Sequence, residues 1–242
     1  MKNKMNFRYM AYLLLSFLIS GSLSTKASGI QEREGIPVRQ ERDVSSFDAL
    51  EAGGAFRIFL TQGGQQKVVV EADANYIEDI ETSVKAGKLS ISTRKNLQDP
   101  GEMNIYITFK SLKEIDISGA CHLTSENRLK FDNLEVECSG AGKIMLTLAA
   151  GHIDLDCSGA GQVELLGSVA SMNLELSGAA NLDANELEAT TLIAEISGAS
   201  RAAVHVTGEL SAEVSGAGNL IYQGDPMLRQ SDVSGAASIK KR

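Results

Sequence analysis

The chain is poor in the residues that build most catalytic and binding sites. Its 242 residues include no Trp, three His, three Cys and three Pro, and aromatic residues make up 5%. A chain with so few rings lacks the stacking platforms on which nucleic-acid bases pack. Lys and Arg number 23 against 31 Asp and Glu, which gives a formal net charge of −8. This charge argues against binding nucleic acid or an anionic membrane surface.

A long apolar run occurs only near the N-terminus, over residues 10–19, and it follows a basic segment that ends at Arg8. Small residues lead from this run to Ala27, so the pattern predicts a secretory signal peptide over residues 1–27. The run is short for a membrane span, and an uncleaved anchor is the alternative. Cleavage removes four cations and no acid, so the formal charge moves from −8 to −12. We therefore expect an exported chain without a membrane span that is periplasmic, secreted or on the outer surface.

The residues after the predicted cleavage point have a different composition. Residues 28–43 are charged, contain Pro37 and show no apolar periodicity, so the sequence predicts a linker there. The predicted domain then spans residues 44–238, which is enough for one core or one elongated repeat body.

The tripeptide Ser-Gly-Ala returns seven times at intervals of 18 to 21 residues. One position before each Ser the residue is apolar, two positions before it is always Asp or Glu, and the fifth residue after it is apolar again. Alternation with a period of two predicts half-buried strands on both sides of each tripeptide. The seven serines are Ser118, Ser139, Ser158, Ser177, Ser197, Ser215 and Ser234.

A unit this small cannot bury its own apolar face, so successive units must stack. Equivalent strands then lie side by side and parallel, about 4.8 Å apart. The sequence thus predicts an all-β protein, a right-handed parallel β-helix (β-solenoid) of about 19 residues per turn, or rung. Each rung is a strand, a Ser-Gly-Ala corner, a second strand and a variable bend. Residues 44–109 hold a degenerate eighth copy, with Gly53 at the Ser position, and we expect wider, irregular rungs there that cap the stack.

Each corner residue has a predicted role. The Gly allows the positive φ of a sharp corner. The Ala is expected to point inward, and the Ser hydroxyl to form hydrogen bonds with the neighbouring rungs.

Two of the three cysteines are placed so that a disulfide between them has to be considered. Cys138 and Cys157 both directly precede a corner Ser, so they should be inward-facing neighbours in adjacent rungs. Parallel side chains keep their β-carbons about 4.8 Å apart, wider than the ~3.8 Å usual for disulfides. Buried thiols are therefore favoured and a bridge is the alternative, while Cys121 has no obvious partner.

Carboxylates form the one candidate site. An acid stands two positions before every corner Ser, and in the first three repeats a second acid stands four positions before it. Repulsion at about 4.8 Å is only about 0.9 kcal/mol per pair in water, so a solvated face is one interpretation. A weak Ca²⁺ site is the other, because carboxylates are the ligands that Ca²⁺ prefers. The candidate ligands are Glu114, Asp116, Glu135, Glu137, Asp154 and Asp156.

The chain resembles the head GIN domain family of auto-transporter adhesins over roughly residues 44–238. The likeness lies in Phe47-Asp48-Ala49-Leu50, Phe56-Arg57-Ile58, Gly87-Lys88-Leu89-Ser90-Ile91 and the returning Ser-Gly-Ala-Gly corners. The resemblance implies a right-handed β-helix in a bacterial cell-envelope protein.

We expect a non-enzymatic, exported cell-envelope protein that binds or scaffolds through its surface, with an envelope or extracellular protein or glycan as partner and no cofactor. A polysaccharide lyase or hydrolase on a parallel β-helix is the alternative. No catalytic residue is predicted, because every corner Ser has an acid where a nucleophile elbow has Gly. A structural subunit that docks through the last rung is a further alternative. The sequence leaves the oligomeric state open.

Overall fold

A computed structural model describes residues 36–242. The predicted signal peptide over residues 1–27 lies outside this part. Within it, seventeen β-strands join one sheet, and a single 3-10 turn, η1 (Ile77–Asp79), is helical. None of the described residues forms a helix long and apolar enough to span a bilayer.

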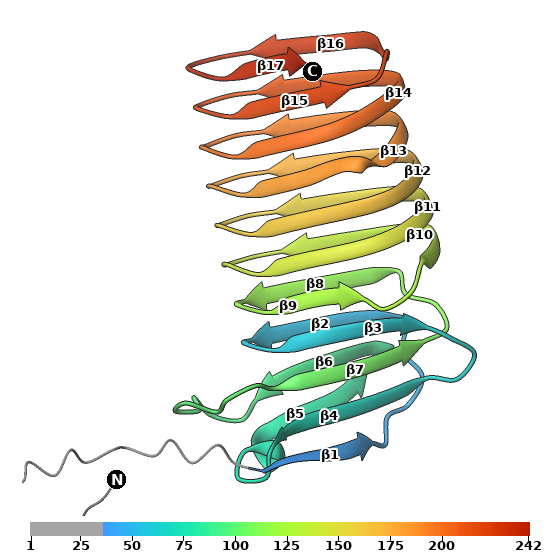
Figure 1. Ribbon diagram of the computed structural model, residues 1–242, viewed down its shortest axis with the longest axis vertical. Coiled ribbons are helices and arrows are strands. Elements are labelled where there is room, and N and C mark those ends of the chain that lie inside the picture. Colours follow the sequence, from blue (N-terminus) through green and yellow to red (C-terminus); the bar gives the residue numbers. More distant parts are fainter. Residues whose placement is uncertain (1–35) are drawn as a thin grey trace, which may run out of the picture. The chain divides into compact units, whose positions relative to one another are not determined.

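The repeats stack in sequence order as a right-handed β-solenoid, which confirms the predicted fold (Figure 1). The corners lie on one side of the stack and the bends on the other. All pairings between successive repeat rungs are parallel. The strands are β8 (Glu114–Gly119), β9 (His122–Ser125), β10 (Leu129–Cys138), β11 (Lys143–Cys157), β12 (Gln162–Leu176), β13 (Asn181–Ile196), β14 (Arg201–Val214), β15 (Asn219–Gln223), β16 (Met227–Val233) and β17 (Ser238–Lys241).

The register follows the sequence repeat. Cys138 pairs with Cys157, and the acids that precede them pair likewise. The apolar residues one position before and five positions after each corner Ser are buried in every rung except the last. The predicted inward positions of the strands that flank each corner are therefore confirmed.

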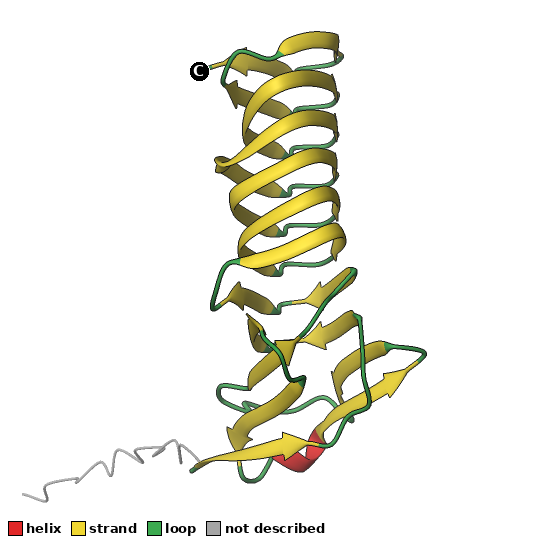
Figure 2. Ribbon diagram, turned by 90° about the vertical axis from the view of Figure 1, so that its right-hand side faces the viewer, coloured by secondary structure: helices red, strands yellow, loops and turns green. Residues whose placement is uncertain are grey.

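The bends are more regular than predicted. β11 to β14 run through the bend without a break, so they curve around the side of the stack (Figure 2). Differences in rung length are absorbed by register shifts in these strands, between Glu164 and Leu166 and between Ala184 and Glu188. Such a shift accommodates an extra residue while the flanking strand pairing is kept.

The N-terminal strands do not stack in sequence order. β2 and β3 lie between β6 and β7 on one side and β8 and β9 on the other. Gly53 pairs with Ser118, which places the degenerate copy in phase with the repeats. Antiparallel pairs made by β1, β4 and β5 close this end, instead of wider rungs. The strands are β1 (Pro37–Arg42), β2 (Ala49–Gly54), β3 (Arg57–Gln62), β4 (Lys67–Asp73), β5 (Ile80–Lys85), β6 (Lys88–Thr93) and β7 (Asn104–Phe109).

β1 falls inside the segment predicted as a linker over residues 28–43. It pairs antiparallel with β4, and its residues alternate between exposed and half-buried. Arg42 Nη2 donates a hydrogen bond to the carbonyl of Ile77 at 2.8 Å. Residues 37–42 are therefore part of the sheet. The strand lacks an apolar face because it lies at the edge, where polar side chains stay in contact with water.

The corner glycines are required for two independent reasons. Their φ angles lie between 70° and 87° in all seven corners, a region that residues with a β-carbon rarely adopt. A β-carbon on any of these glycines would also lie 2.5–2.9 Å from the carbonyl oxygen of the glycine one rung below. The column begins at Gly54, which lies under Gly119.

Two predicted details of the corner are wrong. The Ala is exposed in every corner, and the inward residue is the one after it, such as Cys121 or Ala180. The chain turns this way because the Ala N–H donates to the Gly carbonyl of the rung below at 2.7–2.8 Å. Among the corner serines that the structure describes, only the Ser197 hydroxyl donates to a neighbouring rung, to Leu176 at 3.4 Å. The backbone therefore holds the corners together.

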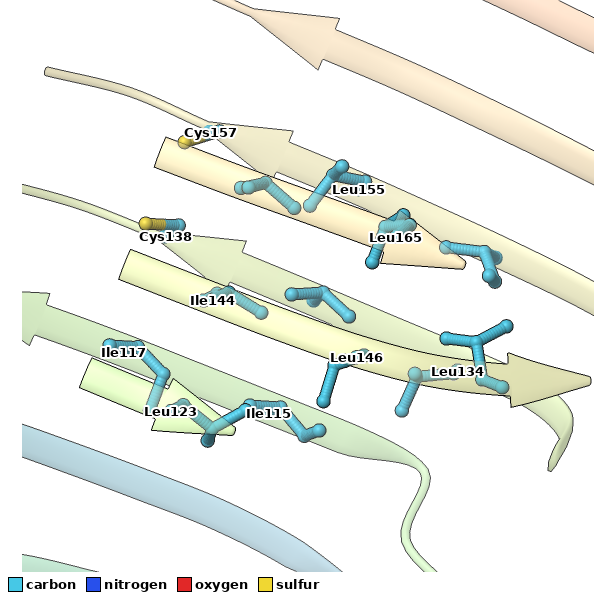
Figure 3. Packing of buried hydrophobic residues seen from close by; sticks show 14 of the residues in the cluster. Ile115, Ile117, Leu123, Leu134, Cys138, Ile144, Leu146, Leu155, Cys157 and Leu165 are labelled. Carbon is cyan, nitrogen blue, oxygen red and sulfur yellow. The ribbon is translucent and has the colours of Figure 1, made fainter. Parts of the chain in front are cut away.

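Cys138 and Cys157 point into the interior on the corner side, one rung apart (Figure 3). Both are free thiols, as is Cys121. A β-carbon at Gly161 would lie 2.9 Å from the sulfur of Cys138 and 2.6 Å from that of Cys157. The second Gly of the Ser-Gly-Ala-Gly corner thus leaves room for the two sulfurs. Burial raises the pKa of the Cys121 thiol, which keeps this group protonated.

Gly159→Val is expected to lower the free energy of unfolding by about 2–4 kcal/mol, because it combines an unfavourable φ with a backbone clash. Gln162→Val places the same side chain on the exposed strand of the same rung and should change stability by less than about 0.5 kcal/mol. Chemical denaturation of both variants measures the difference. Equal losses would contradict the assigned corner geometry.

Candidate functional site

The outer surface of the strands that precede the corners carries carboxylates in regular columns. We call this surface the acidic face, and its main column holds the residue two positions before each corner. These side chains share one face because strand alternation has a period of two and the rungs are in register. The column consists of Glu51, Asp116, Glu137, Asp156, Glu175, Glu195, Glu213 and Asp232.

The structure brings the six predicted ligands together as two parallel columns. Glu135 lies between Glu114 and Asp154, and Glu137 lies between Asp116 and Asp156. No group of three or more His, Cys, Asp or Glu side chains in the described part of the chain is arranged to hold a metal ion. Weak Ca²⁺ binding to these carboxylates stays a prediction.

Two of the six carboxylates are held by partners that the sequence did not reveal. Lys88 Nζ forms an ion pair with Glu114 Oε1 at 2.5 Å, which raises the Lys88 pKa. The two residues lie on β6 and β8 with Ala49 of β2 between them, so the small Ala side chain lets the Lys reach across. Asp154 accepts a hydrogen bond from Asn173 Nδ2 at 2.7 Å. The negative charge of the six carboxylates is therefore partly compensated.

Two carboxylates of the main column, Asp116 and Glu137, have raised pKa values. Partial burial, and then the nearby Glu51, raise the pKa of Asp116. Partial burial and the charge of Asp116 also raise the pKa of Glu137. Ionisation of Asp116 and Glu137 therefore opposes folding, since the folded state binds these two protons more tightly than the unfolded chain does.

The acidic face is hollowed in two places. One open hollow of about 430 Å³ is lined by the carboxylates of two adjacent columns and by Ile193, whose exposure of 50% is unusual for this residue. A second, of about 280 Å³, follows the main column from Glu175 to Asp232. The surface is therefore a shallow, acidic strip that runs along the stack.

A Ser, a His and an Asp meet at the side of the strip. His152 Nδ1 lies 2.7 Å from Ser171 Oγ, and His152 Nε2 lies 3.1 Å from Asp154 Oδ2. These are the functional groups of a serine hydrolase. The neighbouring carboxylates of Glu135 and Asp156 oppose that chemistry, because they place negative charge where an oxyanion needs positive potential. Sequence reasoning missed the cluster because Ser171 meets His152 only through the register of adjacent rungs.

The opposite face carries a stack of two half-buried aromatic rings near the N-terminal end of the described residues. The rings of Phe59 and Tyr106 are stacked with centroids 5.0 Å apart. The guanidinium of Arg39 lies 5.1 Å from the Tyr106 centroid, on the side of β7 away from β3. Both faces of Tyr106 are therefore covered, which leaves its edge and no free platform for a sugar ring.

Glu137→Gln is expected to raise the melting temperature at pH 7 by on the order of 1–2 °C, because it removes a charge that is disfavoured in the folded state. The gain should disappear below the ordinary Glu pKa of 4.5, where wild-type Glu137 is protonated in both states. Thermal unfolding over a pH series tests this. Glu186→Gln, on an exposed part of β13, is the control, and an equal gain there would contradict the explanation.

Comparison with known proteins adds to this geometry. Residues 46–226 match the family described as "Putative auto-transporter adhesin, head GIN domain". A solved structure of a putative adhesin from Bacteroides fragilis is 27% identical, covers 86% of this chain and 97% of its own, and superposes with a TM-score of 0.81. No curated protein matches the chain.

Two further solved structures share the fold. A putative lipid binding protein from Parabacteroides distasonis is 23% identical, with 86% of this chain and 98% of its own covered, at a TM-score of 0.68. A putative adhesin from Parabacteroides merdae is 18% identical, with 86% and 97% covered, at a TM-score of 0.64. At these identities the likeness concerns the fold. The family match spans most of the chain, and the chain therefore belongs to the head GIN domain family.

Proposed function

We propose that the protein is an exported, non-enzymatic component of a bacterial cell envelope that acts by adhesion or scaffolding through its surface. The observation that carries this proposal is the regularity of the stack. Rungs of 18–21 residues follow one another without a large insertion, whereas catalytic sites are usually built on loops that a scaffold positions. Membership of an adhesin family points in the same direction.

The partner that fits the acidic face is an extended envelope or extracellular protein or glycan with cationic groups. The main column offers one carboxylate about every 4.8 Å along a nearly straight line. Its net charge excludes nucleic acid as a partner for this surface. An elongated ligand could contact several rungs at once, so many weak contacts would add to useful affinity.

Export and binding are tested on the same protein. Mass spectrometry of the chain from its native host should show an envelope or secreted species that begins near Ser28. That species should bind host envelope extracts or members of a glycan array. The variant Glu175→Gln/Glu195→Gln/Glu213→Gln should lose most of this binding, because it removes the charge of three consecutive rungs.

The matched control neutralises three carboxylates of β13 outside the acidic face, in the variant Asp183→Asn/Glu186→Gln/Glu188→Gln. It changes the net charge by the same amount and should bind like the wild type. Recovery of the full-length chain in the cytoplasm would refute export. Equal loss of binding in both variants would refute the acidic face as the contact surface.

The alternative function is hydrolysis or elimination on a polymer. We expect no release of reducing ends, no unsaturated products from uronate polymers and no ester cleavage above background. The critical variants are Ser171→Ala and Thr191→Ala, since these residues occupy the same position in adjacent rungs. Turnover that Ser171→Ala abolishes and Thr191→Ala retains would establish an enzyme in place of the proposed function.

A further inference from the structure

The last rung has an unpaired edge on both of its strands. β16 pairs with β14 and β17 pairs with β15, and no other described strand covers their outer edges. The N–H groups of Ser234 and Ser238 donate to the rung below. In a parallel ladder, alternate residues bond to opposite neighbours. The N–H and carbonyl groups of Ser231, Val233 and Ile239 therefore point away from the stack.

The same rung leaves the end of the apolar core open. Val233 is 49% exposed, whereas the residues at its position in the six preceding rungs are at most 2% exposed. Met227 and Leu228 of β16 are exposed by 57% and 49%. Covering this layer would remove apolar surface from water, which is the dominant favourable term in most protein association.

The opposite end of the stack is built differently. Its outermost strand, β1, begins with Pro37 and pairs antiparallel with β4, so it does not continue the parallel repeat. Proline on an edge strand also hinders pairing with another chain. The two ends are therefore not complementary, so a fibre of copies joined head to tail is disfavoured.

We infer that the open end binds a second copy of this chain, last rung against last rung. A two-fold axis perpendicular to both sheets turns β16 antiparallel to its copy and β17 antiparallel to its copy at the same time. Such a contact is closed and self-complementary. The unpaired backbone groups would gain partners, and the two open core layers would cover each other.

The charges of β16 fit this arrangement. Arg229 lies near the start of the strand and Asp232 near its end, so antiparallel pairing brings each close to the other in the second copy. Arg229 already forms an ion pair with Glu209 of its own chain, and its guanidinium has further donors for a second carboxylate. Lys240 and Arg242 of the two copies would face each other across β17. Salt therefore screens both the attraction across β16 and this repulsion across β17.

The experiment measures mass against concentration by analytical ultracentrifugation of the purified chain, over a roughly hundredfold range. The wild type should shift from monomer to dimer as its concentration rises. Ser231→Pro removes an N–H that the fold does not use and places a ring on the edge, so it should stay monomeric with an unchanged melting temperature. Ser231→Ala is the control and should dimerise like the wild type.

Charge exchange tests the antiparallel geometry. Arg229→Asp and Asp232→Arg should each weaken dimerisation, and the double variant should restore it. Hydrogen exchange is measured on the wild type, so this test does not depend on whether a variant folds. The amides of Val233 and Ile239 should become protected only at concentrations where the dimer forms.

A wild type that stays monomeric throughout would overturn the inference. This also holds if the open edge binds acidic strand-forming peptides instead of a second copy. A dimer that Ser231→Pro leaves intact, or that leaves the Val233 and Ile239 amides unprotected, would place the interface elsewhere. The proposed adhesive function is tested on the acidic face and can fail or hold independently of these results.

Discussion

The close contact of each corner glycine with the glycine one rung below is the constraint on which the rest of the structure depends. The carbonyl oxygen of Gly140 lies 2.6 Å from the position of a β-carbon on Gly159, and the Ala160 N–H donates to that same carbonyl at 2.7 Å. The two contacts fix both the φ of the corner and the height of the next rung. The corner can therefore neither slip along the chain nor tilt, and every strand that leaves it starts in register.

That register converts a local sequence pattern into long columns of like side chains. Inward columns form a continuous apolar core. One of these columns contains Cys138 and Cys157, which are neighbours in the strand register and are free thiols. The outward column of acids follows by the same rule and carries an electrostatic cost, since the pKa values of Asp116 and Glu137 are raised. A scaffold alone needs polar residues in this column, and Ser, Thr or Asn would avoid the repulsion. The acid that recurs in all seven repeats is therefore the basis for placing the proposed contact surface on this column.

The sequence predicts what repeats and misses what does not. The corners, the buried positions and the acidic columns could be derived because each recurs at a fixed spacing, so one repeat explains the others. The sequence predicts a linker where β1 lies, because an edge strand with charged residues has no apolar face to detect. The insertion of β2 and β3 between later strands could not be foreseen, since it depends on tertiary pairing. For the same reason the ion pair of Lys88 with Glu114, and the contact of His152 with Ser171, appear only in the structure. The Ala of the corner was placed inward on size alone, whereas its backbone hydrogen bond turns it outward.

The two ends of the stack also differ in whether they keep the repeat. A solenoid built from identical rungs has no intrinsic stop, because its end always presents a free edge of the kind that binds the next rung. The N-terminal end is stopped by residues that break the repeat, through antiparallel strands, Pro37 and exposed charge. The last rung keeps the repeat instead, with Ser234-Gly235-Ala236 and the same hydrogen bonds to the rung below. An edge that keeps the repeat keeps the free backbone groups of a pairing edge, which is the basis of the proposed contact between two last rungs.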